Sequence, residues 1–300
     1  MPRVFCCNGY SISEFSLFAQ GDIVNGRRGF DMTGSFRCVT FLSDFGMADE
    51  TVACCKGLLL RRGVDLPLID ISHEVPPFDV ISGGWMLAGA ILYMPVGVHL
   101  AVVDPGVGTR RNILVVKSSR GDLLVGPDNG LLIPAAERTG GVSACWSVER
   151  PASGIETAST TFHARDIMAP VVADLVAGMP PEECGISLTR GDMTSFPLPA
   201  PHTTPGKISG HVALVDTFGT IRTNIPWTSL GNVGESGMRI SCGWLFSIPI
   251  GSTFSDVNSG ELVALEDSWG FVSIAVNRGR ASDILGFKPG DPVSVEFTIP

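Results

Sequence analysis

The chain has 300 residues, of which 44% are hydrophobic, with a formal net charge of −9 and a sequence pI near 5.0. Such a composition can bury a sizeable core. The acidic balance disfavours nucleic acid as a partner, because proteins that bind the phosphate backbone carry clustered Lys and Arg. The longest apolar run, Met86 to Val98, is too short for a membrane helix and is broken by Gly89 and Pro95. We therefore expect a soluble protein with no membrane partner.

The cysteines and the N-terminus indicate a reducing compartment. Eight cysteines are present without a CxxC motif, and the adjacent pairs Cys6-Cys7 and Cys54-Cys55 are poorly placed to form disulfides or to hold tetrahedral zinc. The N-terminus also lacks the charged start and apolar stretch of a secretion signal. We expect reduced thiols, a cytoplasmic location and no bound metal.

The first part of the chain alternates short apolar strands with helical stretches. Residues 1–37 are rich in glycine and lack sustained periodicity, so we expect an N-terminal extension that can be poorly ordered. The strands predicted next are Cys38–Ser43, Leu66–Ile71, His99–Asp104 and Asn112–Ser118, and the helices are Asp49–Arg62, Asp79–Met94 and Asp166–Ala177. Continuously apolar strands separated by helices are typical of a sheet covered on both faces. We predict an α/β domain over residues 38–190, with a central, mostly parallel sheet flanked by helices.

The second part of the chain follows a proline-rich connector. Four prolines within residues 191–207 disfavour a helix there and predict an extended linker. Short strands with turn residues dominate afterwards, at His211–Val215, Ser247–Ile250, Glu261–Leu265, Val272–Val276 and Val293–Phe297. We predict a smaller, all-β, barrel-like domain over residues 208–300.

Four polar segments lie at strand ends or in glycine-rich turns, where α/β folds gather their ligands. They span residues 43–46 (SDFG), 104–111 (DPGVGTRR), 161–166 (TFHARD) and 216–219 (DTFG). None is a nucleotide-binding motif, because the GVG at 106–108 lacks the third glycine of GxGxxG and no GxxxxGK[ST] is present. The sequence also has no HExxH, and its histidines lack the spacing of metal ligands.

Taken together, these segments resemble the S-adenosylmethionine (SAM) hydroxide adenosyltransferases, which are relatives of the fluorinases and chlorinases. The resemblance runs from about Val39 to Val295 and includes the GPDNG turn at 126–130 and the NRG at 277–279. It implies hydrolysis of SAM to adenosine and L-methionine by in-line attack of water-derived hydroxide on C5′. The catalytic set of the hydroxide branch matches Asp104, Arg111 and His163, whereas the halogenases carry Tyr at the Asp position and lack the His.

The chemistry of SAM agrees with this set. The sulfonium is already a good leaving group, so the enzyme needs only to place a nucleophile behind C5′, and no cofactor is implied because SAM is the substrate. Arg111 can stabilise a developing hydroxide, while Asp104 and His163 hold it and handle the proton. A carboxylate beside the nucleophile would repel a halide.

Each of these three residues also has an ordinary structural interpretation from its local sequence. Asp104 could cap the turn before Pro105, Arg111 could be a solvated surface charge, and His163 could be a core histidine bonded to the backbone. The match of all three residues to one pattern favours the catalytic interpretation.

The resemblance also implies a set of substrate-binding residues. Asp44 would bind the ribose hydroxyls, Phe78 would line the nucleoside pocket and Phe218 would stack on adenine. The residues that would bind the methionine part of SAM are Asp49, Thr51, Asp216 and Ser268. From the sequence alone, Asp49 could instead cap the helix that it begins, and Phe78 could be a core residue.

Two positions depart from the family pattern. Thr220 stands where an Asn usually bonds the adenine edge, and a threonine has only a hydroxyl to offer. Trp269 stands where the halogenases place an Arg for the methionine end. The contacts to adenine and to the substrate carboxylate are therefore the parts of the site that the sequence leaves open.

The family also implies a homotrimer whose active sites lie between the α/β domain of one subunit and the β domain of its neighbour. SAM, adenosine and methionine are the implied small-molecule partners. Two alternatives remain at this point. One is a SAM-dependent halogenase that forms 5′-halo-5′-deoxyadenosine, and the other is a non-catalytic SAM-binding protein.

Overall fold

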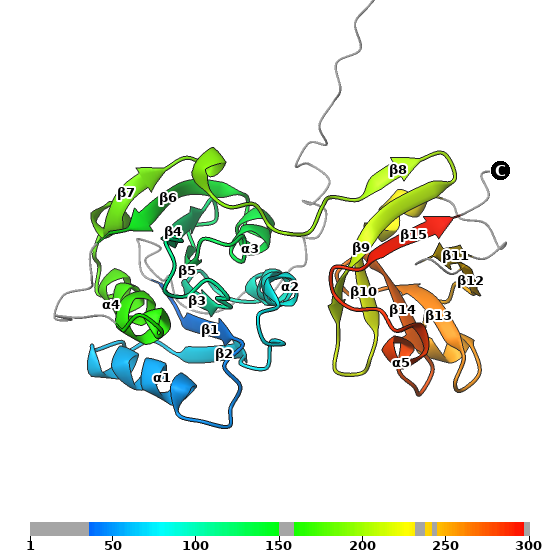
Figure 1. Cartoon of the computed structure of the whole chain (residues 1–300), viewed down its shortest axis with the longest axis horizontal. Coiled ribbons are helices and arrows are strands. Elements are labelled where there is room, and N and C mark those ends of the chain that lie inside the picture. The colour runs from blue at the N-terminus through cyan, green and yellow to red at the C-terminus, as the bar shows by residue number, and fades with distance from the viewer. Residues whose placement is uncertain (1–35, 150–158, 232–237, 242–244, 297–300) are drawn as a thin grey trace, which may run out of the picture. The chain divides into compact units, whose positions relative to one another are not determined.

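The fold consists of two β-sheets that follow one another along the chain (Figure 1). It is known from a computed structural model, which describes residues 36–149, 159–231, 238–241 and 245–296. Apart from its last two residues, the predicted extension at 1–37 lies outside this described part. The predicted domain boundaries stay a prediction.

The first sheet has seven strands in the order β2-β1-β3-β5-β4-β6-β7. They are β1 (Val39–Ser43), β2 (Leu68–Ser72), β3 (Val98–Val102), β4 (Ile113–Ser118), β5 (Leu123–Pro127), β6 (Val142–Val148) and β7 (Gly185–Leu188). Strands β2, β1, β3 and β5 pair in parallel, while β4 and β7 run against their neighbours. Five of the seven strands thus share one direction, which confirms the predicted mostly parallel sheet.

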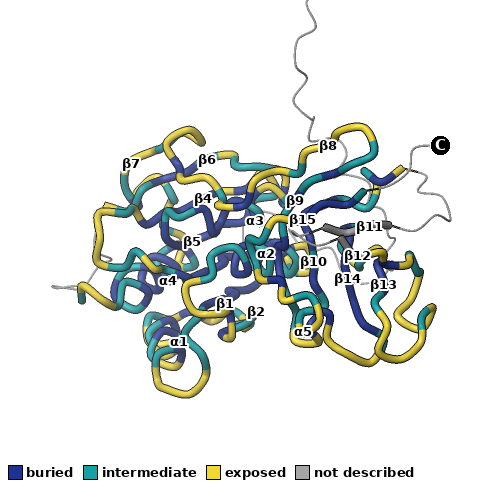
Figure 2. Tube along the Cα trace, turned by 45° about the vertical axis from the view of Figure 1, so that its right-hand side comes forward, coloured by how far each residue is buried: buried dark blue, intermediate teal, exposed yellow. Residues whose placement is uncertain are grey.

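Helices cover both faces of this sheet because alternate strand residues point to opposite sides. The helices are α1 (Thr51–Arg61), α2 (Val80–Ile91), α3 (Ile133–Arg138) and α4 (Ala169–Val176), the last continuing a π-helical turn, η2 (Ala164–Met168). Phe41 and Leu100 pack into the core shared with α1 and α4, whereas Leu42 and Ala101 pack into the core shared with α2 and α3. The middle strands β1, β3, β5 and β4 are accordingly buried along most of their length, whereas β2, β6 and β7 are only partly buried (Figure 2).

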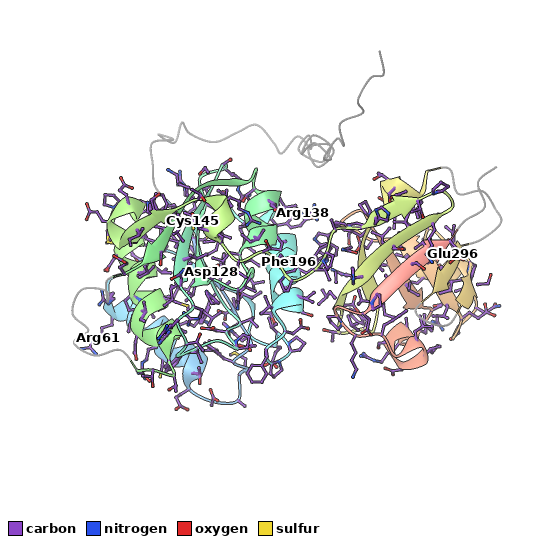
Figure 3. The ribbon with its side chains drawn as sticks, turned by 45° about the horizontal axis from the view of Figure 1, so that its top comes forward. Arg61, Asp128, Arg138, Cys145, Phe196 and Glu296 are labelled. Carbon is purple, nitrogen blue, oxygen red and sulfur yellow. The ribbon has the colours of Figure 1, made fainter. Side chains whose placement is uncertain are left out.

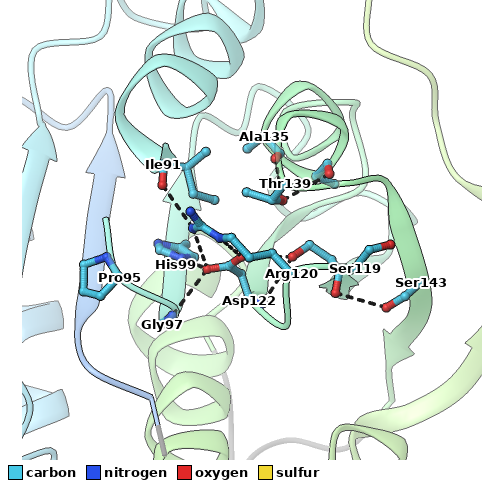
Figure 4. A network of polar contacts seen from close by, with 12 residues as sticks. Ile91, Pro95, Gly97, His99, Ser119, Arg120, Asp122, Ala135, Thr139 and Ser143 are labelled. Atoms are coloured by element: carbon cyan, nitrogen blue, oxygen red, sulfur yellow. Dashed lines mark hydrogen bonds and ion pairs between the residues drawn. The ribbon is translucent and has the colours of Figure 1, made fainter. Parts of the chain in front are cut away.

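A polar cluster interrupts the second of these cores at the start of β3 (Figure 4). His99 is fully buried, and its Nδ1 and Nε2 lie 2.9 Å from Thr40 Oγ1 and 3.1 Å from Asp122 Oδ1. Arg120 donates two hydrogen bonds to the Asp122 carboxylate and one to the carbonyl of Ile91 at the end of α2. We refer to His99, Arg120 and Asp122 as the buried triad.

The second sheet has eight strands, and every pairing between its strands is antiparallel. They are β8 (His202–Thr204), β9 (Lys207–Val215), β10 (Ile221–Pro226), β11 (Met238–Ser241), β12 (Leu245–Ile248), β13 (Leu262–Glu266), β14 (Phe271–Val276) and β15 (Pro292–Glu296). The order is β12-β11-β15-β9-β10-β14-β13, with β8 on β9. The short helix α5 (Ala281–Leu285) and the turns η5 (Trp227–Leu230) and η6 (Phe254–Asp256) complete this region. The core contains Ile208, Ile221, Ile274 and Val293 among its members. The predicted all-β character is confirmed.

The turn η3 (Pro181–Cys184) leads into β7, and the chain between the sheets begins after β7 with the turn η4 (Arg190–Asp192). It then packs against the first sheet's domain before it reaches β8. Met193 and Phe196 belong to the core on the α2 side. A Cβ on Gly84 in α2 would lie 2.6 Å from the Phe196 ring, so this helix position has room only for glycine. Figure 3 shows Phe196 beside α2. The proline-rich stretch is therefore partly anchored.

The cysteine thiols are unpaired, and no helix of membrane-spanning character is found in the described ranges. The described cysteines are free thiols, and burial raises the pKa of Cys55 and of Cys145 to about 12, which makes both poor nucleophiles at neutral pH. In the described ranges, no helix has the length and apolar character needed to span a membrane.

Candidate active site

Asp104 lies just beyond the carboxyl end of β3, beside the corresponding end of β1. The register pairs Ser43 with Val102, so that Asp44 and Asp104 leave neighbouring strands at the same edge of the sheet. The strand end is fixed by Asn129, whose Nδ2 donates to the carbonyl of Val103 at 2.8 Å. Two carboxylates are thus held close together at this edge.

Arg111 reaches Asp104 by way of the turn at 105–110. Its Nε donates to Asp104 Oδ1 at 2.8 Å, and its Nη2 donates to Asp104 Oδ2. This bidentate pair is largely shielded from solvent, with side chains 10% and 7% exposed for Arg111 and Asp104. Gly108 in the turn has φ +78°, and a Cβ there would lie 2.7 Å from the Thr160 carbonyl oxygen. The close approach of these backbones brings the segment that carries His163 to Arg111.

His163 directly precedes η2 and completes the group. Its Nδ1 lies 3.0 Å from Arg111 Nη2, although the two residues are 52 positions apart. Because a guanidinium can only donate, Nδ1 must be the acceptor and the neutral ring carries its proton on Nε2. Burial and the adjacent Arg111 charge lower the pKa of His163, while Asp104 and Asp166 act in the opposite direction. The structure thus brings the three predicted catalytic residues together.

Asp44 and Phe78 also meet at this edge of the sheet. The Phe78 N–H donates to Asp44 Oδ2 at 2.9 Å. Phe78 has φ +69° and a side chain that is 70% exposed, so the core interpretation of this residue is wrong. Burial raises the pKa of Asp44, and the Asp104 charge adds to the effect, while the Phe78 N–H opposes it. Asp44 and the backbone of Phe78 therefore lie at the same edge of the sheet as Asp104.

Asp49 and Thr51 lie at the start of α1. Asp49 Oδ1 accepts the Thr51 N–H at 3.0 Å, and hydrogen bonding from the Thr51 hydroxyl, together with this N–H, lowers the pKa of the Asp49 carboxyl. Helix α1 has Glu50 at its N-cap and no side-chain cap hydrogen bond, so Asp49 lies one residue before the cap and closes a short turn onto Thr51 instead of capping the helix. The contacts place neither residue against Asp44 or Asp104.

Two supporting residues escaped the sequence analysis. His73 is buried, its Nδ1 lies 2.7 Å from Ser43 Oγ, and its carbonyl accepts the Gly46 N–H at 2.7 Å. It therefore fixes both flanks of Asp44. Phe162 packs edge-on against Phe45 with ring centres 6.1 Å apart, which links the Asp44 loop to the His163 segment. Both contacts join positions far apart in the sequence, where local patterns carry no signal.

The β9–β10 hairpin carries Asp216 and Phe218. Asp216 Oδ1 accepts the N–H groups of Phe218 and Thr220, both at 2.9 Å, which closes the turn. Gly219 has φ +78°, and a Cβ there would lie 2.6 Å from the Arg280 Cβ. This turn presents Phe218 to solvent with 79% of its side chain exposed.

The turn before β14 carries Ser268 and Trp269. Ser268 is exposed, and the Trp269 N–H donates to Asp267 Oδ1 at 2.9 Å. The Arg222 guanidinium of β10 lies over the Trp269 ring, 4.0 Å from its centre, and its Nη2 lies 3.8 Å from Asp216 Oδ2. Arg222 thus joins the turn of Ser268 to that of Asp216. The sequence analysis missed it, because one Arg between buried strand residues looks like an ordinary surface charge.

The predicted site residues therefore form two groups. Among the described residues, no hydrogen bond, ion pair or ring contact joins the group of Asp44 and Asp104 to the group of Asp216 and Phe218. Within the same ranges, no three His, Cys, Asp or Glu side chains are gathered as metal ligands.

Comparison with known proteins defines the family. Two family models match, the SAM hydroxide adenosyltransferase N-terminal domain over residues 39–185 and the C-terminal domain over residues 210–294. The chain belongs to the SAM hydroxide adenosyltransferase family.

Individual relatives agree with this assignment. The chain is 41% identical to an (R)-S-adenosyl-L-methionine hydrolase from Salinispora tropica, over 86% of this chain and 97% of that relative. It is 28% identical to a fluorinase from Actinoplanes sp., over 86% of this chain and 96% of that enzyme. A solved structure of an uncharacterized conserved protein from Thermotoga maritima superposes with a TM-score of 0.78 at 37% identity, over 86% of this chain and 99% of that one.

Proposed function

We propose that this protein is an enzyme that hydrolyses SAM to adenosine and L-methionine, with water as the source of the nucleophile. The observation that carries the proposal is the contact of Asp104, Arg111 and His163 in one shielded group. The (R)-S-adenosyl-L-methionine hydrolase relatives support the same substrate and reaction.

In the proposed reaction, an oxygen derived from water attacks C5′ in line with the sulfonium. The C5′–O bond forms as the C5′–S bond breaks, and the bonding electron pair leaves with sulfur, so that methionine departs as a neutral thioether. The remaining proton of the attacking water is released overall. Because SAM carries its own leaving group, we assign no cofactor or metal to this step.

The hydrogen bonds suggest how the three residues divide the work. Arg111 occupies the lone pair on Nδ1 of His163, so the imidazole can donate from Nε2 and orient the attacking oxygen. The Asp104 oxygens keep further lone pairs beside those bonded by Arg111, which makes Asp104 the base that accepts the water proton. The Arg111 cation stabilises negative charge on the attacking oxygen.

The flanking residues suit the remainder of SAM. Asp44 would accept the ribose hydroxyls, and Phe78, whose N–H donates to Asp44 and whose ring is exposed, would cover the nucleoside. Phe218 would stack on adenine, while Asp49, Thr51, Asp216 and Ser268 would serve the methionine end. Exposure of Phe218 and the hydrogen-bonded turn beneath it support a binding role, because an apolar ring held out into solvent is costly without a partner.

We propose a homotrimer in which each active site combines Asp44 and Asp104 of one subunit with Asp216 and Phe218 of its neighbour. The separation of these residues into two groups supports a shared site. Exposed apolar side chains, among them Met47 and Phe78 in one group and Phe218 in the other, are candidates for burial on assembly.

Three further proposals concern the chain as a whole. The second sheet would close as a barrel, because hydrogen bonds link β13 to the segment that follows β12. The Ala264 N–H donates to the Pro249 carbonyl, and the Gly251 N–H donates to the Ala264 carbonyl. The free thiols support a cytoplasmic location. The acidic net charge supports small molecules rather than nucleic acid as partners.

Product analysis tests the proposed function. Purified protein is incubated with SAM, and the nucleosides and amino acids are separated by chromatography. Equal amounts of adenosine and methionine are expected, and they should increase with time. A 5′-halo nucleoside in chloride buffer would assign the chain to the halogenases. Tight SAM binding without any nucleoside product would make it a binding protein.

A further inference from the structure

Arg222 lies beside Asp216 and the turn of Ser268, which the proposed function assigns to the methionine end of SAM. It lies in β10, where it pairs with Leu214 of β9 on one side and with Ser273 of β14 on the other. Its guanidinium stacks over Trp269 at 4.0 Å, and only 19% of the side chain is exposed. A stacked guanidinium keeps its N–H donors in the plane of the group, where they remain available to an acceptor.

The donors of Arg222 have no acceptor in the described protein. The nearest carboxylate oxygen, Asp216 Oδ2, is 3.8 Å from Nη2, which is beyond hydrogen-bond distance. Apart from this long ion pair, the guanidinium has no polar partner among the described residues, and it makes no hydrogen bond there. The Arg111 guanidinium, in contrast, donates two hydrogen bonds to the Asp104 carboxylate. A shielded cation whose donors are unused is a site for an anion.

Asp216 supplies the complementary charge. Its Oδ1 is occupied by the turn N–H groups of Phe218 and Thr220, whereas Oδ2 faces Arg222 and accepts no hydrogen bond in the described residues. A cation and an anion with unused hydrogen-bonding capacity, a few ångströms apart, match the carboxylate and ammonium groups of a zwitterionic amino acid.

We infer that Arg222 binds the α-carboxylate of the methionine part of SAM while Asp216 Oδ2 binds its α-ammonium group. This inference rests on the proposed function, and it names the residue that determines which sulfonium substrates are accepted. SAM should be preferred over adenosyl sulfoniums that lack the carboxylate. Trp269 then has a defined task, since its ring holds the guanidinium in place.

The test compares SAM with decarboxylated SAM, which keeps the sulfonium, the nucleoside and the amine. Wild-type enzyme should show a kcat/KM for SAM about 10- to 100-fold above that for decarboxylated SAM. Arg222→Gln should lower kcat/KM for SAM by a similar factor, mainly through KM, and leave decarboxylated SAM nearly unchanged. Arg222→Lys should recover part of the preference, because it keeps the charge but not the fork. Arg61→Gln, which removes an exposed arginine of α1 (Figure 3), is the matched control and should change neither substrate.

Equal loss on both substrates in Arg222→Gln would overturn the inference, and so would a wild-type enzyme that does not distinguish them. The second result needs no variant, so it holds even if Arg222→Gln fails to fold. Should wild-type protein release no adenosine from SAM, the proposed function fails while the inference stays testable by calorimetry. L-methionine should then bind more tightly than 3-(methylthio)propylamine, and Arg222→Gln should abolish the difference. An unchanged difference would contradict the role of Arg222.

Discussion

The two ends of β3 carry the same three residue types in opposite settings. The buried triad at the start of the strand joins His99, Arg120 and Asp122, and the group beyond its end joins Asp104, Arg111 and His163. In the first, both ring nitrogens of the histidine have partners within the protein. In the second, among the described residues only Nδ1 does. Unused hydrogen-bonding capacity, and not residue type, marks the end of the strand that can act on a substrate.

Position on the sheet explains this difference. The start of β3 is covered by α2 and by the β4–β5 turn, so its polar groups must satisfy one another. The carboxyl end opens into loops, as ligand sites in parallel sheets generally do. The comparison predicts that changes at the first end affect stability and that changes at the second end affect turnover.

The largest effect should come from Arg111→Met and His163→Ala. Each removes a contact that acts on the attacking oxygen, so turnover of SAM should fall by about 10²- to 10⁴-fold, with little change in SAM affinity. The melting temperature of His163→Ala should stay close to that of the wild-type protein, whereas Arg111→Met also leaves the shielded Asp104 carboxylate without its cation and should lower the melting temperature. Steady-state kinetics and thermal melts check both statements. Full turnover in both variants would contradict the claim that the carboxyl end of β3 is the catalytic end.

Asp122→Asn should show the reverse pattern. The change leaves His99 and Arg120 without their anion, and the free energy of unfolding should fall by about 3–5 kcal/mol. Burial acts to raise the pKa of Asp122, but the hydrogen bonds and charges of His99 and Arg120 outweigh it and hold the pKa well below the ordinary value. The stabilisation is therefore present above the ordinary pKa and is lost as pH falls through the folded value.

Denaturant unfolding measures this loss, and turnover per folded molecule is the companion measurement. If Asp122→Asn lost turnover a hundredfold while keeping its stability, the two ends of β3 would not differ as argued.

A smaller effect is expected at the ribose. Asp44→Ala removes the proposed acceptor of the ribose hydroxyls, so calorimetric affinity for adenosine should fall by about tenfold or more. The catalytic contacts of Arg111 stay in place, and turnover at saturating SAM should fall less than in Arg111→Met. Unchanged adenosine affinity would place Asp44 outside the pocket.

The smallest expected effect is a shift to lower pH of the titration of His163. His163 has a lowered pKa in the folded protein, so its neutral form, which accepts from Arg111, should persist below the ordinary histidine pKa of about 6.5. The associated stabilisation is complete above that value and is lost as pH falls through the folded pKa. NMR titration of the ring, assigned by loss of the signal in His163→Asn, should give a midpoint below 6.5, together with an acid limb of kcat/KM at the same pH. A midpoint at or above 6.5 would contradict the contact with Arg111.

Much of the first sheet was predictable because its strands are continuously apolar and its helices are long. Strand β1 and helices α1 and α2 lie within three residues of their predicted ends. Strands β5, β6 and β10 are among those missed, since glycine in Leu123–Pro127, polar residues in Val142–Val148 and Arg222 in Ile221–Pro226 obscure an apolar pattern. The predicted helix at Asp166–Ala177 begins earlier, as a π-helical turn over Ala164–Met168.

The candidate site was predictable in the same uneven way. Asp104 and Arg111 are seven positions apart around one turn, so their contact follows from local sequence once a turn is expected. His163 required the family resemblance, because it meets Arg111 only through tertiary packing. His73 and Arg222 act across strands and turns far apart in sequence, and only a structure reveals such contacts.

The central claim is that the carboxyl end of β3 directs water to C5′ of SAM, and isotopic labelling tests it most directly. The reaction is run in H₂¹⁸O with excess chloride or fluoride, and the nucleoside product is analysed by mass spectrometry. We predict adenosine with ¹⁸O at the 5′ oxygen and no 5′-halo nucleoside, because a halide would have to lie beside the Asp104 carboxylate in a shielded site. Halide incorporation that outpaced ¹⁸O, or adenosine without the label, would contradict the account.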